Sequence, residues 1–232
     1  MKEHFHELLE GLRTRLIAMG AEVEGQIRLS IEALTQADAP LARQVIERDR
    51  FVDQLEIRNE EDAIHLLATQ QPVAGDLRFL VSALKINADL ERIGDHAVNI
   101  AEAAERLSTQ RPFKPWVDVP YMAEVARGML KDSLDAFVRS DPSLAREVCR
   151  RDDVLDEKNK SILRELLTYM AEKPSLISTC IEIIGVARNL ERVGDLATNI
   201  AEETIFIAKG EVIKHRVTLE KAEKPQDGPT GA

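Results

Sequence analysis

Residues 86–102 read INADLERIGDHAVNIAE, and residues 186–202 read VARNLERVGDLATNIAE. Ten of these 17 positions are identical, whereas two unrelated segments would agree at about one position. Both copies place apolar residues at three- and four-residue steps, which is the period of an α-helix. The chain therefore contains an internal repeat of two helical units, 100 residues apart at this point.

The nine prolines divide the chain into six helical stretches. Proline disrupts a helix interior because it lacks the N–H group and clashes with the preceding turn. Asp38 recurs as Asp141, an offset of 103, and each stands just before a proline, which is typical of a helix start. We therefore predict an all-α fold of two tandem three-helix bundles, at residues 1–110 and 120–213. A proline-rich linker is expected at 111–119 and a polar, disordered tail at 214–232.

Composition excludes several classes of protein. The chain has 31 Lys and Arg against 41 Asp and Glu, a net charge of −10, which disfavours nucleic-acid binding. Its apolar runs are shorter than the roughly 20 residues that cross a bilayer, and the charged N-terminus does not resemble a signal peptide. Cys149 and Cys180 are single, which indicates buried thiols in a reducing compartment. We expect a cytoplasmic protein with no membrane insertion.

Acidic residues recur at equivalent places in both halves. Each repeated motif holds an acid pair four residues apart, Glu91 with Asp95 and Glu191 with Asp195, on one face of its helix. Such pairs destabilise a helix by roughly 0.2–0.5 kcal/mol each, and the glycines between them cost about 1 kcal/mol more. A bound cation would offset the repulsion. The candidate metal ligands are Asp49, Asp53, Glu91, Asp95, Asn99 and Glu102 in the first half, and Asp152, Asp156, Glu191, Asp195, Asn199 and Glu202 in the second.

Two other interpretations of the acids stay open. Acid pairs are frequent by chance in so acidic a chain, and most are solvated faces; Arg92 and Arg192 could also pair with them as salt bridges. Carboxylate and amide oxygens suit Mg²⁺, Mn²⁺, Ca²⁺ or iron, whereas structural zinc usually recruits Cys or His. His96 is replaced by Leu196 in the second copy, so we do not expect it to be a ligand.

Residues 72–102, PVAGDLRFLVSALKINADLERIGDHAVNIAE, closely resemble the PhoU family, the accessory proteins of the phosphate-specific transport system. Residues 174–202 resemble the same motif less closely. The resemblance implies two three-helix bundles with pseudo-two-fold symmetry. It also implies metal binding by the E/D-x-x-x-D motifs, in some members as iron clusters. Iron, manganese, magnesium or zinc are thus the expected cofactors. The second half lacks the Gly-Asp-Leu-Arg of residues 75–78, so any role of Asp76 and Arg78 is confined to the first bundle.

The same resemblance implies a regulatory role. Members are cytoplasmic negative regulators of the phosphate-starvation response and of phosphate uptake, which link the ATPase subunit of the phosphate ABC transporter to a sensor histidine kinase, and they often form homodimers. One alternative is an accessory regulator of a low-affinity phosphate transporter. Another is a metal-dependent helical-bundle enzyme. The sequence carries no phosphate loop, dinucleotide fingerprint or nucleophile elbow, so we do not expect an enzyme. A helical module with solvated acids is a further alternative.

Overall fold

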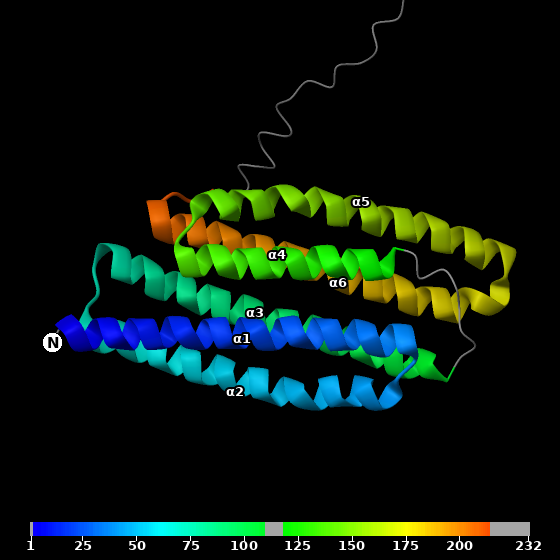
Figure 1. Cartoon of the computed structure of the whole chain (residues 1–232), viewed down its shortest axis with the longest axis horizontal. Coiled ribbons are helices and arrows are strands. Elements are labelled where there is room, and N and C mark those ends of the chain that lie inside the picture. The colour runs from blue at the N-terminus through cyan, green and yellow to red at the C-terminus, as the bar shows by residue number, and fades with distance from the viewer. Residues whose placement is uncertain (1, 110–117, 214–232) are drawn as a thin grey trace, which may run out of the picture.

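The computed structural model describes residues 2–109 and 118–213, and both ranges are almost entirely helical. Six long helices run in the order α1 (Lys2–Gln36), α2 (Ala39–Gln70), α3 (Ala74–Ser108), α4 (Val119–Arg139), α5 (Pro142–Glu172) and α6 (Ile177–Lys209) (Figure 1). A single 3-10 turn, η1 (Pro174–Leu176), precedes α6. The predicted all-α fold of six helices is confirmed. Residues 111–117 of the linker predicted at 111–119 and the predicted tail at 214–232 lie outside the described residues, and α4 begins at Val119 within the predicted linker.

The duplicated helix starts form as the sequence predicts. The Asp38 side chain accepts a hydrogen bond from the backbone N–H of Leu41 (2.9 Å), with Pro40 in the first turn of α2. Asp141 accepts from Ser143 (2.8 Å) and Leu144 (3.2 Å) at the start of α5. Each carboxylate satisfies N–H groups that the first helical turn leaves unpaired. Both halves therefore set the direction of their second helix by the same local chemistry.

Helices α1–α3 form one bundle, α4–α6 form the other, and α3 lies beside α6 at the centre (Figure 1). Three cross-contacts give the direction of this pair: Ser82 with Glu203, His96 with Asn189, and Arg106 with Glu182. As the residue number rises along α3 it falls along α6, so the two repeated helices are antiparallel. An antiparallel pair of equivalent helices is related by a pseudo-two-fold axis perpendicular to the helices.

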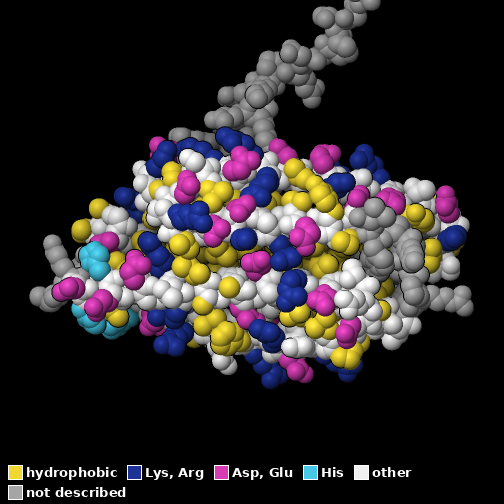
Figure 2. Space-filling model, viewed as in Figure 1, with side chains coloured by type: hydrophobic (Ala, Val, Ile, Leu, Met, Phe, Trp, Pro, Cys, Tyr) yellow, Lys and Arg dark blue, Asp and Glu magenta, His cyan; other side chains and the backbone are white. Residues whose placement is uncertain are grey.

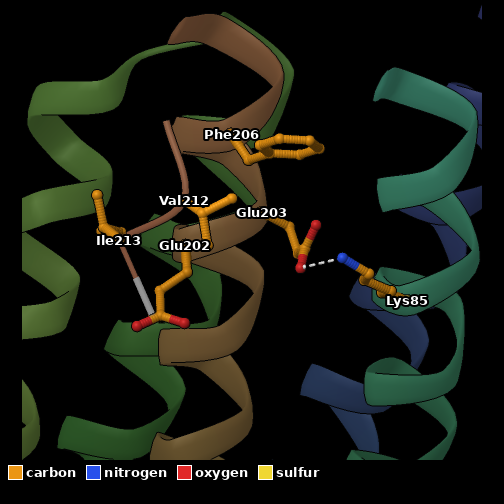
Figure 3. A pocket seen from close by; sticks show the side chains of 6 residues that line it. All are labelled: Lys85, Glu202, Glu203, Phe206, Val212 and Ile213. Atoms are coloured by element: carbon orange, nitrogen blue, oxygen red, sulfur yellow. Dashed lines mark hydrogen bonds and ion pairs between the residues drawn. The ribbon is translucent and has the colours of Figure 1, made fainter. Parts of the chain in front are cut away.

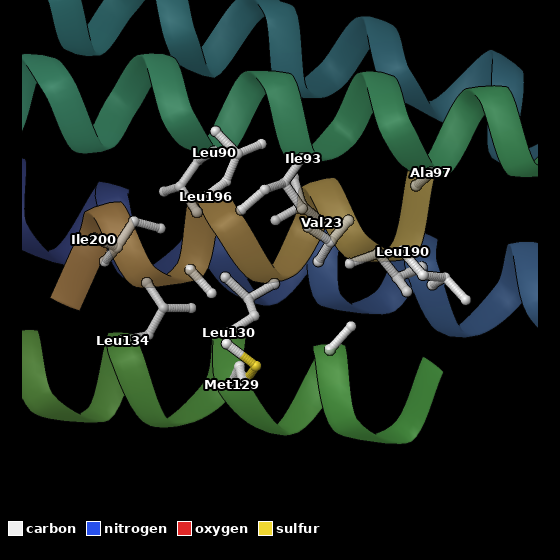
Figure 4. Packing of buried hydrophobic residues seen from close by; sticks show 14 of the residues in the cluster. Val23, Leu90, Ile93, Ala97, Met129, Leu130, Leu134, Leu190, Leu196 and Ile200 are labelled. Carbon is white, nitrogen blue, oxygen red and sulfur yellow. The ribbon is translucent and has the colours of Figure 1, made fainter. Parts of the chain in front are cut away.

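The two bundles share one hydrophobic core. Buried apolar side chains of both bundles form a single cluster, and Figure 4 shows those of α1, α3, α4 and α6 meeting at the junction. Leu90 and Leu190, equivalent positions of the repeat, are both completely buried there. Removing the apolar surface of these side chains from water supplies most of the stabilisation of the folded state. The bundles are thus halves of one packed unit.

The surface in Figure 2 is a mixture of basic, acidic and scattered apolar side chains. Cys149 and Cys180 are buried free thiols, as predicted. Among the helices of residues 2–109 and 118–213, none combines the length and the apolar character needed to cross a bilayer.

Candidate functional site

The acids of the first half come together between α2 and α3. Burial, followed by repulsion from Asp53 and Asp95, raises the pKa of Asp49 to about 6 from its ordinary 3.8. Burial also raises the pKa of Glu91, with further repulsion from Asp95, Glu56, Asp53 and Asp49. These mutual effects place carboxylates of α2 and α3 in one electrostatic cluster. We call Asp49, Asp53, Glu56, Glu91 and Asp95 the first cluster.

Gly94 explains how Asp49 approaches α3 so closely. A Cβ atom at Gly94 would lie 2.9 Å from Asp49 Oδ1 and 3.4 Å from a methyl group of Val52. The glycine thus opens a space on α3 that the carboxylate fills. Asp49 Oδ1 is buried there and has no hydrogen-bond partner within the described chain. A buried carboxylate oxygen in this state is costly unless a positive group compensates it.

Gln26 of α1 points its side chain toward the same space. It is only 1% exposed, and neither its Nε2 nor its Oε1 atom has a hydrogen-bond partner among the described residues. Its Oε1 lies 3.5 Å from the position of a Cβ on Gly94. The inner side of the first cluster therefore has two buried oxygens, one from Asp49 and one from Gln26.

Sequence reasoning missed Gln26 and Glu56. Glu56 stands seven residues after Asp49, so it extends the Asp49–Asp53 face by one helical turn, and this spacing was a usable signal. Gln26 lies beside Val23 and Ile27 in the apolar stripe of α1, where a polar residue interrupts the pattern. The interruption marks an unusual position, but its partner lies on another helix and cannot be read from the stripe.

The second half assembles a different cluster, made of Asp152 and Asp156 on α5 with Glu191 and Asp195 on α6; Asp152 is included because its Oδ1 lies 3.7 Å from the Cβ position at Gly194. Burial is the main cause that raises the pKa of Glu191 and of Asp195, and Asp156 adds repulsion to both. Arg192 opposes this effect, because its Nη1 donates to Asp195 Oδ2 at 2.8 Å and its Nε lies 3.7 Å from Glu191 Oε2. We call Asp152, Asp156, Glu191 and Asp195 the second cluster. The salt-bridge interpretation thus applies to this half.

Gly194 has a different neighbour from Gly94. The side chain of Leu155 packs against the space that Gly194 opens, and Asp152 Oδ1 is 3.7 Å from the position of a Cβ. Leu155 is equivalent to Val52 by the offset of 103. The larger leucine takes the place that the Asp49 carboxylate occupies in the first half. The glycine is used in both halves for close helix packing, but only the first half places a carboxylate oxygen within 3 Å of the point where its Cβ would be.

The outer candidates Asn99, Glu102 and Glu202 have other contacts. Asn99 donates to Asn189 Oδ1 at 3.4 Å, and Glu102 pairs with Arg106 at 3.5 Å. Glu202 lines a small pocket of about 90 Å³ with Lys85, Glu203, Phe206, Val212 and Ile213 (Figure 3).

In the pocket of Figure 3, Lys85 of α3 donates to the buried Glu203 of α6 at 2.9 Å.

Glu202 and Asp152 also help burial to raise the pKa of Cys149 to about 12, so this thiol stays protonated. Asn199 is partly exposed on α6. A metal role for Asn99, Glu102, Asn199 and Glu202 stays a prediction.

The chemistry of the first cluster fits a hard cation. Its donors are all oxygens, which Mg²⁺, Mn²⁺, Ca²⁺ and iron accept. Within residues 2–109 and 118–213, no group of three or more Asp, Glu, His or Cys side chains is close enough in this arrangement to hold a metal ion. The acids are therefore neighbours around a buried floor formed by Asp49 Oδ1 and Gln26, and their outer members, Asp53 and Asp95, are exposed.

Comparison with known proteins gives a consistent result over most of the chain. A family model described as "PhoU domain" matches twice, at residues 16–104 and 119–204. The chain is 41% identical over 216 residues to a phosphate-specific transport system accessory protein PhoU homolog of Pseudomonas putida, covering 93% of this chain and 84% of the relative. A homolog of the same description from Aquifex aeolicus is 40% identical, covering 93% and 97%.

Solved structures agree with the sequence matches. A crystal structure of PhoU from Pseudomonas aeruginosa superposes with a TM-score of 0.86 at 42% identity, over 89% of this chain and 100% of that one. The phosphate transport system regulatory protein PhoU from Streptococcus pneumoniae gives 0.84 at 27% identity, over 90% and 98%. The tandem arrangement is therefore shared with both proteins over about nine-tenths of this chain.

Proposed function

The chain belongs to the PhoU family, and from this premise we propose that it is an accessory protein of a phosphate transport system. In finer terms, it restrains phosphate uptake and the phosphate-starvation response. It does so as a metal-binding cytoplasmic adaptor between the ATPase subunit of the phosphate ABC transporter and a sensor histidine kinase. The observation that carries the proposal is the match to phosphate-specific transport system accessory proteins, which extends over 93% of the chain at 40–41% identity.

The long helical surfaces suit an adaptor. Four large apolar side chains are exposed where α5 ends and α6 begins: Leu163, Leu167, Ile177 and Ile181. Each pair is spaced four residues apart on its helix, and η1 brings the two helix ends together. Exposed apolar groups on these adjoining helix ends support docking of a partner protein. A partner held here in only one of its conformations would be shifted toward that conformation.

Capture by purified components tests the adaptor role. The full chain, immobilised, is expected to retain the transporter ATPase subunit or the cytoplasmic part of the kinase. The double variant Leu167→Glu and Ile181→Glu should lose that partner, whereas Ile57→Glu, an equally exposed position on α2, should keep it. Failure of the wild-type chain to retain either protein would overturn the adaptor proposal.

The regulatory role is tested in cells. Deletion of the gene should raise phosphate-starvation reporter expression in phosphate-rich medium, and the wild-type gene should restore repression. An unchanged reporter would count against negative regulation.

The proposed homodimer is checked separately by sedimentation of the purified chain, where a monomer at all concentrations would remove it.

For the metal, we propose that Asp49, Asp53, Glu91 and Asp95 hold a cation, with iron, manganese, magnesium or zinc as the candidates. The bound cation would neutralise the crowded carboxylates and so favour their close approach. Elemental analysis should show metal in the purified protein that falls when Glu91→Gln and Asp95→Asn are combined. Glu47→Gln, an exposed acid on α2, is the matched control. Unchanged metal content in the double variant would remove this assignment.

A further inference from the structure

We propose that the two carboxylate clusters are unequal. The first binds a divalent cation on a floor formed by Asp49 and Gln26, whereas in the second Arg192 holds the place of the cation and must be displaced before one binds. This inference rests on the metal-binding part of the proposed function. It is carried by differences between equivalent positions of the repeat.

The floor of the first cluster is polar, and its buried polar atoms lack hydrogen-bond partners among the described residues. Asp49 Oδ1 and both polar atoms of Gln26 are buried, without a partner within the described residues, and both oxygens face the opening at Gly94. Gln26 has as its equivalent Met129, which is completely buried, and Val52 has Leu155, which fills the space at Gly194. The inner side of the second cluster is therefore more apolar: it keeps one carboxylate oxygen, that of Asp152 at 3.7 Å from the Cβ position, where the first offers two oxygens, from Asp49 and Gln26.

The arginines differ although the motif is the same. In the first half Arg92 points back to Asp89, with Nη1 3.8 Å from Oδ1, and so away from Glu91 and Asp95. In the second half the equivalent of Asp89 is Asn189, which is neutral, and Arg192 turns forward to Asp195 at 2.8 Å. An acid-to-amide difference three residues before the arginine thus accompanies the difference in the carboxylates with which it pairs.

The charge around the two clusters adds to this contrast. Glu56 of the first cluster is replaced by Asn159, and Ala88 is replaced by Arg188, which acts on Glu191 electrostatically. The first cluster therefore has five neighbouring carboxylates, whereas the second has four and two arginines beside them. Cation affinity rises with the number of uncompensated carboxylates. A cation approaching the second cluster must break the Arg192–Asp195 bond and meets a more positive field.

Titration of the metal-free full-length chain with Mn²⁺, followed by electron paramagnetic resonance of the free ion, tests the inference. The wild type should show a tight and a weak class of sites, separated by about tenfold or more in Kd. Glu91→Gln should abolish the tight class and Glu191→Gln the weak one. Two classes of equal affinity would overturn the inequality while leaving metal binding in place.

Matched substitutions from the repeat itself identify the cause. Arg192→Met should tighten the weak class by about tenfold, whereas Arg92→Met should change neither class by more than about threefold. Gln26→Met, which installs the residue of the second half, should weaken the tight class by about tenfold. An unchanged weak class in Arg192→Met would refute the role of Arg192. No Mn²⁺ binding by the wild type would overturn both this inference and the proposed metal function, and the capture experiment would still decide the adaptor role.

Discussion

Neutralising Asp49 should stabilise the metal-free protein above pH 6 and have little effect below pH 4. The pKa of this carboxyl in the folded protein is about 6, above its ordinary 3.8, because of burial and then the repulsion of Asp53 and Asp95. The folded state therefore binds more protons than the unfolded state between these two values. The stabilising contribution of protonated Asp49 is fully present below pH 3.8 and is lost as the pH rises through about 6.

The size of the effect follows from the same two values. The difference between 3.8 and about 6 corresponds to at most about 3 kcal/mol, at 1.36 kcal/mol for each power of ten. Because Asp49 is only partly buried, water screens much of this, and we expect about 1–1.5 kcal/mol. Asp49→Asn removes the charge and keeps the shape, so its free energy of unfolding should exceed that of the wild type by this amount at pH 7.5.

Urea unfolding followed by circular dichroism, with a chelator present, measures the change. The wild type should lose stability between pH 4 and pH 7, and Asp49→Asn should lose less. Glu47→Gln, on the exposed side of α2, should match the wild type within about 0.5 kcal/mol. If Asp49→Asn proved less stable than the wild type at pH 7.5, or if its gain were the same at pH 4 and pH 7.5, the electrostatic reasoning would be refuted.

Three further substitutions probe the packing of the helices. Gly194→Ala should destabilise by about 1 kcal/mol, because the new methyl group collides with Leu155, which outweighs the better helix propensity; a more stable variant in urea would contradict this. Lys85→Met removes the ammonium group 2.9 Å from Glu203, which is 2% exposed, and should cost about 1–3 kcal/mol; an unchanged Tm would show that the pair is unimportant. Asp38→Ala removes the cap of α2 and should cost about 1 kcal/mol, seen as a lower Tm with little loss of helix signal; full stability would mean that water satisfies the freed N–H group.

Local chemistry made most of the fold predictable. Asp38, Asp141 and the prolines beside them mark two helix starts to within one residue, because capping depends on neighbours in sequence. The shared core of the two bundles was not predictable in the same way. The packing across the bundles depends on how α3 meets α6. The periodic pattern of α3 shows which of its residues are apolar, but it does not tell those that pack within the bundle from those that pack against α6.

The acids of the candidate site could be predicted from the sequence, but the directions and partners of their side chains could not. The recurrence of the acid pairs correctly placed Asp49 and Glu91 near each other, since α2 and α3 are antiparallel neighbours. The sequence treats the Arg92 and Arg192 motifs as equivalent. In the structure Arg92 contacts Asp89 and Arg192 contacts Asp195, a difference that depends on side-chain direction.

The antiparallel pairing of α3 with α6 bears on how such a chain could arise. Two separate half-length chains packed through this helix would form a homodimer in which every contact occurs twice. Joined in one chain, the halves are free to diverge, and the contact of Lys85 with Glu203 occurs once, because its symmetric positions hold Gly185 and Ala103. Covalent linkage thus converts a symmetric assembly into one whose two faces can acquire separate tasks.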